Sequence, residues 1–525
     1  MFNNRTLILI STAAFCGLFY HQSDGINYLI FNVLLLGALL LRDSMLLKSK
    51  TFLSIATAAL ASAFAIYWYG TDWPLQMNML SLLALAGYSY SRESSLLVAI
   101  FHGGYSFFAS PVVHVFDRLF KSADALKTKE SRLFKRVVLS IVPLVVVFIF
   151  IQIYRSGNPI FDKYVSELNF DFISLEWLFF MLYGAWLMFA FFKQSTIRKL
   201  QHSDIETPDA LRIITEEEHT ESYFGQLIQI PNEVFTGVLL FALLNVLLAC
   251  VNGLDFYFVF FKSKLPEGIS ISQYVHNGTN SLITSIVLAS LIILFYFRGY
   301  LNYYSKSTWL KGLAYLWILQ NALLIFSTAY RNGMYIDGFG LTHKRIGVLI
   351  YLLLTMIGLL TVAIKIALTK NNWFLFRKNA WAIYLTLIVY VMFDWDSIIT
   401  NYNLHHFETD KRMEIDQRYL VNLSHTNLTK LFEFYLVKQK KLNDKKQDID
   451  NEYNEDSFSS SSGRSSMAYT HEIERMVWDK YRELKADYKE HEWPSECYTK
   501  TRNLRETEAL IAQYQLKEVL PVNPR

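Results

Sequence analysis

The chain has 525 residues, of which 52% are apolar and 16% aromatic, and its mean hydropathy is positive. This apolar share is high for a soluble protein of such length, so the composition predicts an integral membrane protein with the lipid bilayer as its main partner. The net charge of only +4 argues against a nucleic-acid partner, which requires a concentrated basic surface. The three cysteines, Cys16, Cys250 and Cys497, are too scattered for a disulfide framework or a zinc site.

The first apolar run, TLILISTAAFCGLFY, follows Arg5. It has the length of a signal peptide, but no A-x-A-like cleavage site comes after it. Phe15 before Cys16 also does not fit a lipoprotein cleavage site. We therefore expect this run to be a retained first membrane span.

Apolar runs then recur along the chain as far as residue 400. A helix needs about 20 apolar residues to cross about 30 Å of hydrocarbon. The runs of suitable length are 137–154, 174–192, 235–256, 279–298, 308–328, 346–368 and 379–396, with shorter ones at 6–20, 26–41, 51–69 and 74–90. The predicted fold is all-α, a polytopic transmembrane helix bundle of about 11–12 spans with a C-terminal helical soluble tail.

Residues 94–113 are interrupted by His102, two glycines and Pro111. The basic segment 114–136 that follows carries seven Lys and Arg, and the loop 42–50 is also basic, so both are predicted to be cytoplasmic. The predicted spans 51–69 and 74–90 lie between these loops and return the chain to the cytoplasm. Residues 94–113 are therefore expected to re-enter the membrane from that side or to lie in its interface.

The basic segment is also amphipathic, with apolar residues at helical spacing. This pattern predicts either a helix on the anionic inner leaflet or a solvated connector helix. The predicted organisation has four parts: N-terminal membrane spans at 1–113, the basic amphipathic segment at 114–136, a transmembrane core at 137–402 and a soluble helical tail at 403–525.

The same orientation assigns the remaining loops to the two sides of the membrane. It places 155–173, 257–278 and 329–345 outside, together with the tail. It places 193–234, 298–307 and 369–378 inside. The sequence YIDGFGLTHKRIG at 335–347 lies in a predicted outer loop, although Arg331, Lys344 and Arg345 make this loop positive.

Three stretches carry a family resemblance. RNGMYIDGFGLTHKR at 331–345 resembles the R-x3-Y-x4-GLT-x2-R pattern of a bacterial multi-pass membrane family, domain of unknown function 4173, which is related to the 4153 type. NGLDFYF followed by ISQYVHNGTNSLI, and DWDSIITNYNL followed by IDQRYLVNLS, are similar to two further segments of that family. The resemblance covers roughly 130–430 and implies a multi-pass protein of a bacterial cytoplasmic membrane. It implies no activity.

Several polar residues near span ends share the predicted outer face. Charges at membrane depth are costly, so they call for partners or a function. The candidate binding residues are Asp255, His276, Arg331, Tyr335, Asp337, Thr342 and Arg345, with His343 beside them. They are interpreted in two ways. In the first, they form one cluster in which Asp255 or Asp337 pairs with Arg331 or Arg345, as an ion or proton site or a binding mouth. In the second, they are helix caps, with Gly338 and Gly340 in a tight turn.

Other polar residues have a simpler interpretation. Asn245 and Asn252 on one span, and Gln320 and Asn321 on another, are expected to join helices by hydrogen bonds. EEEHTE at 216–221 lacks the paired histidines of a helical zinc motif, and no nucleophile elbow, P-loop or dinucleotide fingerprint is present in a suitable context. We expect no enzyme activity, no metal and no cofactor.

The tail is predicted to form helices at 411–446 and 467–490, separated by a serine-rich linker at 451–466. Ile473, Val477, Tyr481 and Leu484 recur on one helix face, and Trp478 and Trp493 favour a packed or partner-binding surface. The sequence thus predicts a non-catalytic signalling, assembly or regulatory component that acts through partners. The alternative is an ion- or proton-coupled transporter of a small solute.

Overall fold

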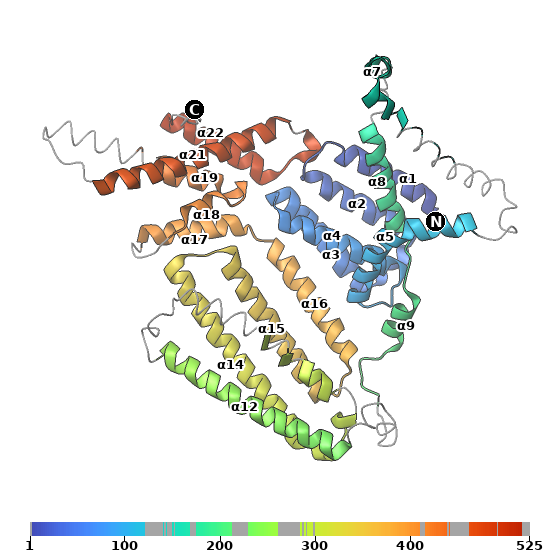
Figure 1. Ribbon diagram of the computed structural model, residues 1–525, viewed down its shortest axis with the longest axis vertical. Coiled ribbons are helices and arrows are strands. Elements are labelled where there is room, and N and C mark those ends of the chain that lie inside the picture. The colour runs from blue at the N-terminus through green and yellow to red at the C-terminus, as the bar shows by residue number, and fades with distance from the viewer. Residues whose placement is uncertain are drawn as a thin grey trace. The chain divides into compact units, whose positions relative to one another are not determined.

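The structure is a computed structural model in which helices predominate (Figure 1). The described residues are 3–120, 140, 143, 147, 150–151, 153–167, 175–212, 229–260, 284–285, 288–289, 291–297, 300–409, 415–437, 440, 461–490 and 492–516. Within these ranges the only extended pairing is an isolated bridge between Ala210 and Lys370. The all-α class is therefore confirmed.

Six described helices are long and apolar enough to cross a membrane. They are α3 (Lys50–Tyr69), α5 (Leu96–Phe120), α12 (Ile230–Phe260), α14 (Thr308–Phe339), α15 (His343–Ala367) and α16 (Asn372–Val391). Three shorter apolar helices are α1 (Asn4–Phe19), α2 (Ile26–Arg42) and α8 (Leu175–Phe192). These helices support a multi-pass membrane protein. Much of the predicted spans 137–154 and 279–298 lies outside the described residues, so the count of 11–12 stays a prediction.

The chain divides into two compact units. The first contains Met1–Phe64, Asn78–Ser203 and Glu492–Ser495, and the second contains Ala65–Met77, Asp204–His491 and Glu496–Arg525. In the first unit, buried amides join the helices. Asn78 of α4 (Asp72–Tyr90) donates to Asn32 of α2 at 3.1 Å and to the carbonyl of Ala59 of α3 at 2.8 Å. A polar residue on α4 is thus matched by partners on two neighbouring helices.

Close backbone packing joins α4 to α5 in the first unit. A Cβ atom on Gly87 would lie 2.0 Å from the carbonyl oxygen of Ala99, and one on Gly103 would lie 2.1 Å from that of Leu83. The two contacts run in opposite directions along the two helices, so α4 and α5 pack antiparallel. Glycine is required at both positions because any side chain would push the helices apart.

Residues 94–113 do not form a re-entrant loop, because Leu96–Phe120 is one continuous helix. Pro111 lies inside it and cannot donate the usual hydrogen bond to the carbonyl of Phe107. The indole N–H of Trp186 on α8 donates to that carbonyl at 2.9 Å instead. The re-entrant prediction is therefore wrong, because this partner keeps the helix satisfied where proline would break it. The interfacial alternative stays a prediction.

The second unit is built on α12, α14, α15 and α16, each of which packs against the next (Figure 1). Gln320 of α14 donates to the side-chain oxygen of Asn245 on α12 at 2.8 Å, and Asn252 donates to the carbonyl of Gln320 at 3.1 Å. The predicted interhelical hydrogen bonds are confirmed for these three residues. Asn321 bonds within its own helix, to the carbonyl of Trp317.

At one end of the second unit, the end of α9 (Arg198–Glu206) and the segment after it bind the first turns of α16 and the residues just before it. Arg377 donates to Asp204 at 3.3 Å and to Asp209 at 2.5 Å. Tyr303 donates to the carbonyl of Leu211 at 2.8 Å. The loops predicted to be cytoplasmic in this unit therefore do lie together. Which face of the membrane they occupy stays a prediction.

At the other end of the second unit lies a polar assembly that we call the head, comprising the described residues of 395–490 and 496–516. Its helices are α17 (Trp395–Thr409), α18 (Gln417–Val421), α19 (Leu428–Leu431), α21 (Ser461–Glu490) and α22 (Tyr498–Tyr514), with short turns at His425–Asn427 and Phe432–Val437. The predicted apolar face of α21 is confirmed, since Ile473, Val477, Tyr481 and Leu484 are all buried.

Two tail predictions need correction, and the tail contains one further helix. The helix expected at 411–446 is interrupted at Asn422–Ser424, where backbone and side chains bond to other elements instead. Residues 461–466 of the predicted linker belong to α21, and 451–460 lie outside the described residues. The helix α22 was not predicted, because its apolar residues are few.

The α4–α5 contact gives a test with an internal control. Gly103→Ala should lower the Tm of the purified protein by several degrees, because the new methyl group meets the backbone of Leu83. Gly104→Ala should leave Tm unchanged or raise it slightly, since open space surrounds Gly104 and alanine favours a helix by about 1 kcal/mol. Thermal unfolding in one detergent compares the two. Equal Tm values would contradict the close packing.

Candidate functional site

The loop between α14 and α15 is shorter than predicted. Helix α14 continues to Phe339, and Gly340 follows with a φ of +83°, its N–H donating to the carbonyl of Ile336. Gly340 alone therefore makes the turn, while Gly338 lies within the helix. The helix extends beyond residue 328 because its polar residues Arg331 and Asn332 are buried against partners.

The remaining residues of the motif cap these two helix ends. Thr342 is the N-cap of α15 and accepts a hydrogen bond from the backbone of Arg345. The Arg345 guanidinium stacks 4.1 Å from the centre of the Tyr335 ring and donates to the carbonyls of Phe339, at 2.7 Å, and Gly340. The spacing R-x3-Y-x4-GLT-x2-R thus describes a capped turn between two helices. This agrees with the interpretation of Tyr335, Thr342 and Arg345 as residues that cap helix ends.

Arg331 belongs to a different contact. Its guanidinium lies 3.0 Å from the carboxylate of Asp255 on α12, and the Arg331 side chain is buried while that of Asp255 is 11% exposed. Ser327 also donates to Asp255 at 2.6 Å, and Arg331 donates to Thr328 at 3.0 Å. The pair joins α12 to α14 and is compensated by these hydroxyl groups.

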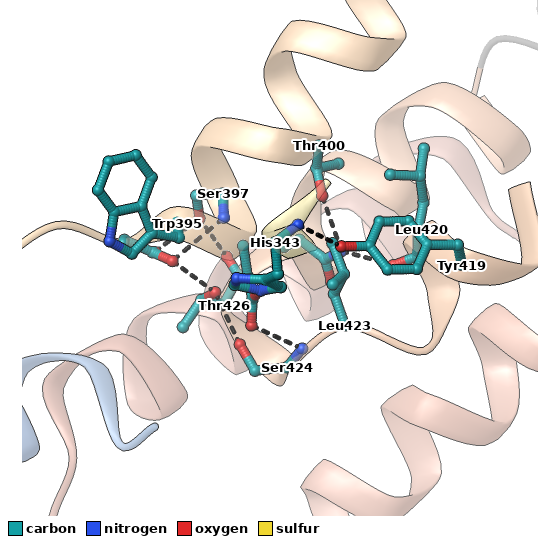
Figure 2. Close-up of polar contacts among 12 residues, drawn as sticks. His343, Trp395, Ser397, Thr400, Tyr419, Leu420, Leu423, Ser424 and Thr426 are labelled. Carbon is teal, nitrogen blue, oxygen red and sulfur yellow. Dashed lines mark hydrogen bonds and ion pairs between the residues drawn. The ribbon is translucent and has the colours of Figure 1, made fainter. Parts of the chain in front are cut away.

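The most connected polar site lies where α15 begins and α17 begins (Figure 2). Nε2 of His343 lies 2.5 Å from Oδ1 of Asp396. The other carboxylate oxygen of Asp396 accepts from the backbone N–H of Ser424 at 2.9 Å. One carboxylate therefore joins a membrane helix, the helix after the last span and the loop after α18.

A second carboxylate continues this network. Asp394 accepts from the hydroxyl groups of Ser397 at 2.7 Å and Thr426 at 2.9 Å. Thr426 is also within 3.0 Å of the Ser424 hydroxyl group. Figure 2 shows Ser397, Ser424 and Thr426 around His343, with the Trp395 ring at one edge. We call His343, Asp394, Asp396, Ser397, Ser424 and Thr426 the interface network.

The interface network favours the ionised form of Asp396. Burial raises the pKa of Asp396, but hydrogen bonds from His343 and Ser424 lower it by more, so its pKa lies below the ordinary value. The charged form is the one the folded protein stabilises.

Further contacts join the head to the loop at 340–343. Asn403 of α17 accepts from the N–H of Leu341 at 2.6 Å and donates to its carbonyl at 2.9 Å. The backbone N–H of His343 donates to the hydroxyl group of Tyr419 at 3.0 Å. The loop after α14 and the head are thus held by several independent hydrogen bonds.

Lys480 of α21 holds the interrupted segment of the head. Its ammonium group donates to the carbonyls of Val421 at 2.9 Å and Leu423 at 2.6 Å, and to the side chain of Asn427 at 2.7 Å. Burial lowers the pKa of Lys480 to about 7, against the opposing effect of Asp396 and Glu483. The segment that supplies Ser424 to the interface network is therefore itself fixed by α21.

The predicted cluster of candidate residues separates into several contacts. Asp255 pairs with Arg331, Arg345 stacks on Tyr335, and Asp337 is exposed, with the Tyr402 hydroxyl at 3.4 Å. His276 and the stretch 216–221 lie outside the described residues. Of the described members, Asp255 and Arg331 form the expected ion pair between α12 and α14, whereas Tyr335, Thr342 and Arg345 form a separate contact at the turn.

Sequence reasoning missed Asp394, Asp396, Ser424 and Lys480 as site residues. The first three lie in the segments DWDSIITNYNL and IDQRYLVNLS that carried the family resemblance. The sequence signal was therefore present in the family resemblance, but it did not indicate that the two segments form one polar site. For Lys480 no local pattern distinguishes it from the other lysines of α21.

A family model described as Domain of unknown function (DUF4153) matches residues 30–433. The chain belongs to this family. The match supports the 4153 type named beside the resemblance, whereas the 4173 family itself is not shown. Neither the curated proteins nor the solved structures contain a match to this chain. The DUF4153 match includes every member of the interface network and ends within the head, before α21.

The ionised state of Asp396 can be tested by substitution. Asp396→Asn should destabilise the protein by about 1–3 kcal/mol at neutral pH, because His343 and Ser424 lose a charged acceptor. Because the folded-state pKa of Asp396 is lowered, its contribution is complete above the ordinary carboxyl pKa and is lost as the pH falls through the folded-state value. The Tm difference between wild type and variant should therefore shrink on acidification.

The matched control is Asp337→Asn, at an exposed carboxylate near the end of α14. Surface substitutions of this kind change stability by about 0.5 kcal/mol or less. Thermal unfolding of both variants at several pH values provides the measurement. An Asp396→Asn protein as stable as Asp337→Asn at neutral pH would show that the interface network contributes little.

Proposed function

We propose that this protein is a non-catalytic component of a bacterial cytoplasmic membrane, acting in signalling, assembly or regulation through a protein partner. The observation that carries the proposal is the interface network, which joins the polar head directly to the ends of membrane helices. A head held in this way presents a fixed surface to a partner. It can also transmit a change at that surface to α15 and α17.

The chemistry of the interface network also supports a non-catalytic role. In a nucleophilic site, the serine hydroxyl group would face a histidine that acts as base. Here Nε2 of His343 faces Asp396, while the Ser424 hydroxyl group lies 3.0 Å from that of Thr426. The carboxylates act as acceptors that hold segments together, and no hydroxyl group in the network is positioned for activation by His343.

The tail offers an exposed aromatic anchor for such a partner. Trp493 follows α21 and is 64% exposed, whereas Trp478 is packed against Phe432. Exposed tryptophans are typical of residues that dominate binding energy at protein interfaces. We propose that the tail lies on the outer side of the membrane, because the basic segment 114–136 favours the cytoplasm and seven predicted spans separate it from the tail.

The partner role is tested by copurification after crosslinking in native membranes. Wild-type protein should retain a specific polypeptide, and Trp493→Ala should lose most of it while keeping the wild-type Tm, because this side chain is largely exposed. Trp309→Ala, at a 79% exposed tryptophan on α14, is the control and should retain the polypeptide. Absence of any retained polypeptide from wild type, or equal retention by both variants, would contradict the proposal.

A second candidate function is ion- or proton-coupled transport of a small solute. The observation in its favour is the buried pair of Asp255 and Arg331 between two membrane helices. Purified protein in proteoliposomes with an internal pH dye should show no proton flux above empty vesicles under the partner role. A flux that Asp255→Asn abolishes, in a variant that still inserts and folds, would favour transport instead.

A further inference from the structure

A cavity of about 410 Å³ lies beside the interface network, within the second unit. It is situated where three candidate spans end or begin, after α3, before α15 and after α16. These helix ends place the cavity at the membrane–water boundary. Its lining residues are Gly70, Thr71, Asp72, Trp73, Pro74, His343, Val391, Phe393, Asp394, Trp395, Asp396, Asn422, Leu423 and Ser424.

The cavity has an aromatic wall. Trp73, Phe393 and Trp395 all line it. Tyr390 supports two of these rings from behind, stacking on Trp395 at 5.2 Å between ring centres and meeting Trp73 edge-on at 5.6 Å. Trp395 is fixed further by its indole N–H, which donates to the carbonyl of Tyr390 at 2.8 Å. The rings are therefore held in place by contacts outside the cavity.

The same cavity is strongly acidic. Its lining contains Asp72, Asp394 and Asp396, and the only basic side chain in the described lining is His343, which is already paired with Asp396. Asp72 lies in the first turn of α4 and is exposed. The combination of aromatic faces and excess carboxylates is the chemistry that recognises an organic cation, because both attract positive charge.

Neither of two neighbouring cavities has this character. The cavity of about 520 Å³ between α18 and α21 is lined by Lys480 and Lys500 as well as by acids, and Lys500 is paired with Asp487. A third, of about 560 Å³, mixes Lys430 and Arg502 with Asp394, Glu433 and Glu506. Each of these two cavities thus has two Lys or Arg side chains among three carboxylates, whereas the cavity beside the interface network has three carboxylates and only His343, so the excess of negative charge is larger there.

We propose that the cavity at Asp72, Trp73 and Trp395 binds an ammonium group, with the cation against the indole faces and near the Asp72 carboxylate. Two sources share this chemistry at the membrane surface. One is a phospholipid head group that ends in ethanolamine or choline, and the other is a small free amine. The site does not depend on the partner role, since it is defined by the cavity and its charge alone.

The first arm of the test titrates the purified full-length protein with choline chloride and follows Tm and tryptophan fluorescence. Sodium chloride at equal ionic strength and 3,3-dimethylbutanol, the neutral isostere of choline, are the controls. The second arm compares the protein in nanodiscs of phosphatidylglycerol alone with nanodiscs that also contain phosphatidylethanolamine or phosphatidylcholine. Stabilisation by choline assigns a free amine, and stabilisation by the mixed lipids alone assigns a head group.

In whichever arm responds, Trp73→Leu and Asp72→Asn should each weaken the effect at least about fivefold, because each removes one attractive element for the cation. Trp309→Leu, at an exposed tryptophan that does not line the cavity, should leave it unchanged. The proposal is overturned if neither choline nor ammonium lipids stabilise the protein beyond their controls. It is equally overturned if Trp73→Leu and Asp72→Asn respond as wild type does.

Discussion

The arrangement of the second unit depends on one buried carboxylate, that of Asp396. It accepts from His343 at the start of α15 and from Ser424 in the loop after α18, and it lies in the first turn of α17. A buried carboxylate is tolerated only when its oxygens are fully hydrogen-bonded, so its charge requires these partners to be present together. Without it, the head would be attached to the membrane helices mainly by the chain itself and by neutral hydrogen bonds.

The membrane helices follow the same constraint in a different way. Every backbone group at membrane depth needs a partner inside the protein. Where Pro111 removes a backbone donor, the indole N–H of Trp186 supplies one. Where Asn78 is buried, its amide donates to Asn32 and to the carbonyl of Ala59. These local solutions explain why polar residues within the apolar runs interrupt neither α4 nor α5. They also show that an isolated proline or asparagine in such a run is weak evidence for a loop.

Sequence patterns could predict the features that depend on neighbouring residues or on periodicity. The helices, the apolar face of α21 and the amide contacts between α12 and α14 are of this kind. The interface network depends on contacts between segments far apart in the chain, and no spacing rule relates His343 to Asp396 or Lys480 to Val421. The outer-face cluster was predicted in part: Asp255 pairs with Arg331 as expected, but Arg345 stacks on Tyr335 instead of joining that pair.

The cavity and the interface network share Asp394 and Asp396, and this overlap connects ligand binding to the head. A cation near these carboxylates competes with the backbone N–H of Ser424 and the hydroxyl group of Thr426, which donate to them. The cation shifts the position of the head only if it binds more tightly when these carboxylates have released Ser424 and Thr426 than when they hold them. Lys480 limits this response, because it fixes the backbone on both sides of Asn422 through Val421 and Leu423. The segment at 424–426 is thus the part of the head whose position a ligand at the membrane surface would change first.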